Sequence, residues 1–119
     1  MPLRECYTAF GGDLDAFMLR LPSDRLIGRL LRKFPEDGSF RELCAAVSAG
    51  DRETAFRCTH SLKGLCLNLE LPRLLKSSSA LTEALRPGSE YCPETVDSLL
   101  AQVRQDYQTV CDAIGQLDT

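Results

Sequence analysis

The sequence has 119 residues, of which 44% are hydrophobic, and this length and composition suit one domain with a buried core rather than a disordered chain. A formal net charge of −3 argues against a nucleic-acid-binding protein, because such proteins carry a basic face. No apolar run approaches the roughly 20 residues that a membrane-spanning helix needs, and the first residues lack the pattern of a secretory signal. We therefore expect a cytoplasmic protein that binds neither nucleic acid nor membrane.

The six cysteines are interpreted as free thiols of a reducing compartment. Four of them lie at apolar positions of predicted helices, where a thiol behaves as a small hydrophobic group: Cys44, Cys58, Cys66 and Cys111. No two cysteines have the Cys-x-x-Cys spacing that is typical of a structural zinc site. We expect no disulfide framework and no metal bound by this chain.

The chain begins with three short predicted helices, over residues 3–10, 14–21 and 24–34. Each of them has apolar residues three and four apart, which is the spacing of an amphipathic helix. Pro35 ends the third helix. We expect residues 13–34 to pack across one end of the structure that follows.

Four longer helices are predicted next, over residues 36–49, 52–70, 72–86 and 92–117. Ser39 and Glu42 have the spacing of a capping box at the start of the first of them, and Asp51 can cap the second. No stretch alternates with period two for long enough to form a strand. The sequence predicts an all-α, up-down four-helix bundle with short extra N-terminal helices, forming a single domain over residues 1–119. Because one chain supplies all four helices, we expect a monomer.

The helix over residues 52–70 contains the only histidine, His60. Its core stripe contains Ala55, Cys58, Leu62, Leu65 and Leu69. The opposite face contains Phe56, Arg57, His60, Lys63, Gly64 and Leu67, a mixture that a plain solvent-facing side would not have. A glycine inside a helix destabilises it by about 1 kcal/mol relative to alanine, so Gly64 indicates a place where another molecule comes close.

The run His60-Ser61-Leu62-Lys63-Gly64, followed by Asn68-Leu69, resembles the signature of histidine-containing phosphotransfer (HPt) domains. Ala49-Gly50-Asp51 is similar to the loop before the histidine helix of that family. The resemblance covers residues 13–85, with its most specific part at 49–69. One residue departs from the pattern, because the family usually follows Asn-Leu with glycine and this chain has Glu70.

The resemblance implies that His60 is phosphorylated as a carrier in a two-component phosphorelay between a histidine kinase and a response regulator. The implied partners are the receiver domain of a response regulator and a hybrid histidine kinase. The receiver would supply the aspartate and bind the Mg²⁺, because this chain has no acidic cluster beside His60 and no glycine-rich nucleotide loop. We therefore expect a phosphoryl carrier rather than an autonomous enzyme.

The residues around His60 fit this chemistry. A solvent-exposed histidine is a good nucleophile near pH 7. Lys63, one turn along the helix, can contact a phosphoryl oxygen, and Gly64 leaves room for the partner. Arg57 is a second candidate cation, although a solvated surface charge is the better explanation of this residue. Phe56 and Leu67 could form an apolar collar that contacts the partner, or they could be covered by the N-terminal helices.

Two other functions are compatible with parts of the sequence. The chain could be a non-catalytic interaction module that binds a receiver or kinase without relaying phosphate, although the retained histidine, lysine and glycine argue against it. It could also be a metal or haem bundle that uses His60 with Cys58 or Cys66, but both cysteines point away from His60 on a helix. Direction of phosphate flow and membership in a larger hybrid kinase stay open at this point.

Overall fold

The computed structural model describes residues 1–118, and residue 119 of the predicted domain lies outside the described residues. The described part consists of α-helices and one 3₁₀ turn, with no strand among residues 1–118. The elements are α1 (Leu3–Ala9), α2 (Leu14–Arg20), α3 (Asp24–Lys33), η1 (Phe34–Glu36), α4 (Ser39–Ser48), α5 (Arg52–Leu69), α6 (Pro72–Leu85) and α7 (Pro93–Gly115). The predicted all-α class is confirmed, and the four long helices begin and end within three residues of the predicted bounds.

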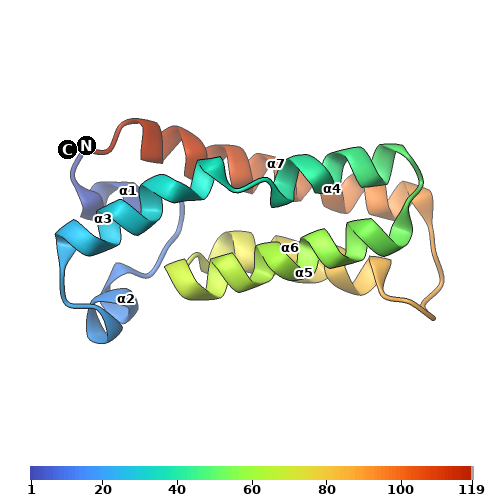
Figure 1. Cartoon of the computed structure of the whole chain (residues 1–119), viewed down its shortest axis with the longest axis horizontal. Helices are drawn as coiled ribbons and strands as arrows, with labels where there is room; N and C mark the ends of the chain where they lie inside the picture. The colour runs from blue at the N-terminus through green and yellow to red at the C-terminus, as the bar shows by residue number, and fades with distance from the viewer. Residues whose placement is uncertain (119) are drawn as a thin grey trace.

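Helices α4 to α7 form the bundle (Figure 1). Helix α5 packs between α4 and α6, and α6 packs in turn against α7. Consecutive helices run in opposite directions, with α4 and α7 along one side of the molecule and α5 and α6 along the other. The buried side chains of α5 and α6 include small hydroxyl-bearing residues, namely Thr59, Ser77, Ser78 and Thr82. Small buried side chains such as Thr59 and Ser78 let two packed helices approach closely.

The prediction that residues 13–34 pack across one end is wrong for α3. Figure 1 shows α3 nearly in line with α4, joined to it through η1. Helix α3 lies beside α5, and Arg32 donates a hydrogen bond to the Asp118 carbonyl just beyond α7. The proline at residue 35 interrupts the α-helical hydrogen bonds, but a single 3₁₀ turn carries the chain onward without reversing it. Phe34 is buried in this turn with its ring 5.4 Å from that of Tyr107, which anchors the joint to α7.

The predicted capping box at Ser39 is also wrong, while the predicted cap at Asp51 is confirmed. Gly38 is the N-cap of α4 and Ser39 is its first helical residue. The Asp37 carboxylate accepts the hydrogen bond of the Ser39 amide at 2.8 Å, so an aspartate two residues earlier does the capping. At α5, the Asp51 carboxylate accepts from the Thr54 amide at 3.1 Å, and hydrogen bonding to Thr54 lowers the pKa of Asp51.

The departure at Glu70 has a structural explanation. Glu70 ends α5 in the left-handed conformation, with φ 56° and ψ 59°, which is where glycine is favoured. The conformation costs a residue with a side chain about 1–2 kcal/mol. Arg20 of α2 forms an ion pair with the Glu70 carboxylate at 3.0 Å, and the Glu70 carbonyl accepts from the Asp13 amide at 3.0 Å. The glutamate therefore ties α2 to the end of α5 while the backbone keeps a conformation suited to glycine.

This conformation predicts an order of stability for two variants at residue 70. Glu70→Gly and Glu70→Ala both remove the ion pair with Arg20, but only glycine relieves the left-handed strain. We expect Glu70→Gly to be more stable than Glu70→Ala by about 1 kcal/mol in urea unfolding. Equal stabilities would contradict the left-handed conformation at this residue.

All six cysteines are free thiols. Burial raises the pKa of Cys66 to about 12, and it also raises the pKa of the buried Cys58 and Cys6 thiols. Cys92 differs, because it is exposed at the N-cap of α7 and hydrogen bonding to Thr95 lowers its pKa. A lower pKa means more thiolate, the form that reacts, at pH 7–8.

We expect Cys92 to react first with a disulfide reagent such as dithionitrobenzoate. The reaction should show one fast thiol per chain near pH 7.5, and Cys92→Ser should remove this phase and leave the slower ones. Cys58→Ser is the matched control, since a buried thiol does not contribute to a fast phase. A fast phase that survives Cys92→Ser would contradict the expectation.

Among the described residues, no helix combines the length and the apolar character that crossing a membrane requires.

Candidate functional site

Helix α5 is covered by α4 on one side and by α6 on the other, and its remaining face is open to solvent. The inward side chains confirm most of the predicted core stripe, since Ala55, Cys58, Leu62 and Leu69 are buried. Leu65 is only half-buried, and Cys66, which the stripe did not include, is buried instead. The candidate site is the open face, centred on His60.

His60 is exposed near the middle of α5. Its ring is nearly parallel to that of Phe56, one turn earlier, with ring centroids 6.4 Å apart and an interplanar angle of 16°. Phe56 is half-buried and packs on the core, so it provides an apolar wall beside the exposed imidazole. Phe56 therefore lies beside His60, and its role in contacting a partner stays a prediction.

Lys63 and Gly64 occupy the next turn. Lys63 is half-buried. The pKa of Glu83 on α6 is lowered, mainly because Arg86 donates hydrogen bonds to this carboxylate, and the positive charge of Lys63 adds to the lowering. A Cβ atom added at Gly64 would meet no other heavy atom within 4 Å. Nothing in the described residues 1–118 therefore requires glycine at position 64 for packing, and the space beside it is open.

The other two predicted partner-binding residues lie on the same face. Arg57 is exposed and already has neighbours, since its guanidinium lies 3.9 Å from the Glu53 carboxylate and donates to the Thr54 hydroxyl at 3.2 Å. Leu67 is 59% exposed, so the N-terminal helices do not cover it. Arg57 is thus a paired surface charge, whereas Leu67 is an uncovered apolar side chain two turns from His60.

Asn68, the last polar residue of the signature, lies at the edge of a different feature. It lines an apolar groove of about 570 Å³ between α2, α3 and α5, together with Leu65 and Leu69. The Asn68 carbonyl accepts a hydrogen bond from Arg20 at 2.8 Å. His60 does not line this groove, so the site is an exposed helix face and not a pocket.

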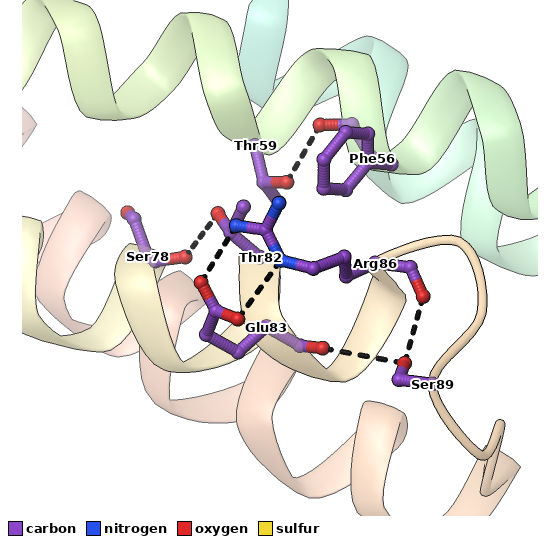
Figure 2. A network of polar contacts seen from close by, with 7 residues as sticks. All are labelled: Phe56, Thr59, Ser78, Thr82, Glu83, Arg86 and Ser89. Carbon is purple, nitrogen blue, oxygen red and sulfur yellow. Dashed lines mark hydrogen bonds and ion pairs between the residues drawn. The ribbon is translucent and has the colours of Figure 1, made fainter.

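The C-terminal end of α6 contributes two charged residues that sequence reasoning missed, Glu83 within the helix and Arg86 at its C-cap. Figure 2 shows the Arg86 side chain lying back along α6 toward Thr59 and Thr82, with Glu83 beside it. The Arg86 guanidinium carbon lies 5.5 Å from the centre of the Phe56 ring. The three-residue spacing of Glu83 and Arg86 near a helix end was visible in the sequence, but their position beside α5 depends on how α6 packs.

The face thus combines an exposed imidazole, a half-buried lysine, an apolar wall and an arginine from a second helix. Within residues 1–118, no three His, Cys, Asp or Glu residues come together as they would around a metal ion. Such a face can offer a nucleophile and cations to an anionic group brought by another molecule.

Comparison with known proteins identifies one family. The model of the Hpt domain matches residues 25–113, which includes the whole of α4, α5 and α6 and most of α7. No curated protein and no solved structure matches the chain.

Proposed function

Because the chain belongs to the Hpt domain family, whose members carry out histidine phosphotransfer in two-component phosphorelays, we propose that His60 carries the phosphoryl group. The observation that supports this most strongly is the geometry of α5. The only histidine of the chain is exposed there, with Lys63 one turn away and open space beside Gly64.

The proposed reaction is an exchange with the aspartyl phosphate of a response-regulator receiver domain. The lone pair of the unprotonated ring nitrogen of His60 forms the N–P bond. The acyl P–O bond breaks, and the aspartate leaves as a carboxylate with the bonding electrons. The same steps in reverse pass the phosphoryl group to a second receiver.

The residues of this chain contribute position and charge. Transfer through a loose transition state spreads negative charge over the phosphoryl oxygens, so a nearby cation stabilises it. Lys63, one turn from His60, is our candidate for this cation. The Phe56 ring lies nearly parallel to the imidazole, and together with the exposed Leu67 it offers apolar surface to the partner. Arg57 can add charge at the rim, although its pairing with Glu53 weakens that contribution.

Magnesium belongs to the partner in this scheme. Mg²⁺ requires several oxygen ligands in octahedral geometry, and the Glu83 carboxylate, which feels the charge of Lys63, is occupied by Arg86. A receiver domain that brings both its aspartate and its Mg²⁺ completes the set of groups. We place the reaction in the cytoplasm, because six free thiols are typical of a reducing compartment.

A transfer assay tests the proposal. Receiver domain labelled on its aspartate with radioactive phosphate is mixed with this chain and Mg²⁺, and the label on the chain is tested in acid and in alkali. We expect label on the chain that is lost in acid and kept in alkali, as for phosphohistidine. A receiver that binds the chain but never passes its label would overturn the proposal and favour an interaction module.

A further inference from the structure

The ion pair on α6 lies beside the proposed phosphorylation site. Arg86 donates two hydrogen bonds to Glu83, from Nε to Oε2 at 2.9 Å and from Nη2 to Oε1 at 2.7 Å. Both side chains are largely exposed, at 50% for Arg86 and 64% for Glu83. An exposed pair of this kind is held weakly and can be exchanged for a better partner.

This ion pair is linked to His60 through Phe56. The guanidinium carbon lies 5.5 Å from the Phe56 ring centre, and that ring stacks beside the imidazole at 6.4 Å. The separation between Arg86 and the imidazole therefore cannot exceed the sum of these two distances. Rotation of a long, exposed arginine side chain spans much of that range.

Glu83 is the acidic group that α6 presents to this side of the face. It is paired with Arg86 and also feels the charge of Lys63, which contributes to its lowered pKa. The remaining charges near His60 lie on the other side. Arg57 is paired with Glu53, and Glu42 of α4 lines a shallow hollow with Arg57 and Ser61. Glu83 is thus placed to compete with a phosphoryl group for both Lys63 and Arg86.

We propose that Arg86 is a second phosphoryl-binding cation, which stays paired with Glu83 until His60 is phosphorylated. A phosphoryl group carries a charge of roughly −1.5 to −2 and three acceptor oxygens, so it attracts a guanidinium more strongly than one exposed carboxylate does. Once His60 is phosphorylated, Arg86 leaves Glu83 and binds the phosphoryl oxygens from the α6 side. This inference rests on the proposed function, because it takes His60 to be the phosphorylated residue.

The test uses chemical phosphorylation, so that it does not depend on a partner. Potassium phosphoramidate is the probe: the ring nitrogen of His60 forms the N–P bond, the P–N bond of the reagent breaks, and ammonia leaves. The pKa of the last ionisation of the bound phosphoryl group is then followed by ³¹P NMR across pH. A nearby cation lowers this pKa, and a nearby carboxylate raises it.

We expect Arg86→Gln to raise this phosphoryl pKa, and Glu83→Gln to lower it, each by about half a unit. The decisive comparison is the double variant. If Glu83 acts by holding Arg86, the effect of Glu83→Gln should fall to less than half in the Arg86→Gln background. Glu5→Gln on α1 makes the same change of charge on an exposed residue away from α5 and α6, and it should leave the pKa unchanged.

Two results would overturn the inference: no change of the phosphoryl pKa in Glu83→Gln, or an equal change with and without Arg86. The second would mean that Glu83 acts only by repulsion through space. Failure of the proposed function gives a different result, since a chain that takes no label from a phospho-receiver can still be phosphorylated by phosphoramidate and titrated. Both substitutions are at exposed side chains, so the variants should fold, which thermal unfolding checks.

Discussion

His60→Gln should fold like the unaltered chain and accept no phosphoryl group from a receiver. Glutamine has a similar polar reach but no nucleophilic ring nitrogen, so the N–P bond cannot form. His60 is exposed, and the only ring packed against it is that of Phe56, among the described residues. The free energy of unfolding should therefore change by no more than about 0.5 kcal/mol. Label transfer from a phospho-receiver and thermal unfolding measure the two quantities.

Receiver binding provides the internal control for this variant. His60→Gln should still bind the receiver, because the apolar side chains of Phe56 and Leu67 are unchanged. Alkali-stable label on the variant would show that another residue is the acceptor, since the chain has no second histidine. A variant that gives the full cellular response without carrying label would favour the interaction module over the relay.

Gly64 should respond to substitution in opposite ways for stability and for transfer. Gly64→Ala and Gly64→Gln place a side chain where the structure has no heavy atom within 4 Å of the added Cβ. Replacing a helix-interior glycine by either residue should raise the free energy of unfolding by about 0.5–1 kcal/mol. Transfer should fall, slightly with alanine and by about tenfold or more with glutamine, since the larger side chain occupies the space that the partner needs.

Gly115 offers a matched control for this pair of measurements. It lies at the last residue of α7, and an added Cβ there also meets nothing within 4 Å. Gly115→Ala should leave transfer unchanged whatever it does to stability. Transfer at the unaltered rate in Gly64→Gln would remove the case for Gly64 as a point of partner access, whereas loss of stability would show that the glycine is needed by the fold itself.

The candidate site could be predicted from sequence to the extent that it lies on one helix. His60, Lys63 and Gly64 share α5, and the regular rise and rotation of a helix place residues three and four apart on one face without knowledge of the rest of the chain. The same regularity located the four long helices, whose ends are marked by local signals such as Asp51 and Pro72. The helix start was predicted wrongly where two capping residues were available. Ser39 was predicted to cap α4, but the Asp37 carboxylate accepts the hydrogen bond of a free amide there, that of Ser39 itself.

The tertiary structure decided what depends on more than one helix. The sequence by itself determined the all-α class, the exposed histidine face and the family resemblance that the Hpt domain match bears out, because each depends on neighbouring residues. It could not place Arg86 beside Phe56, since that contact joins residues thirty positions apart and depends on how α6 packs against α5. It could not align α3 with α4, because Pro35 ends a helix without fixing the direction of the chain beyond it. Nor could it assign the left-handed backbone at Glu70, which the fold maintains through contacts with Arg20 of α2 and with Asp13, the residue before α2.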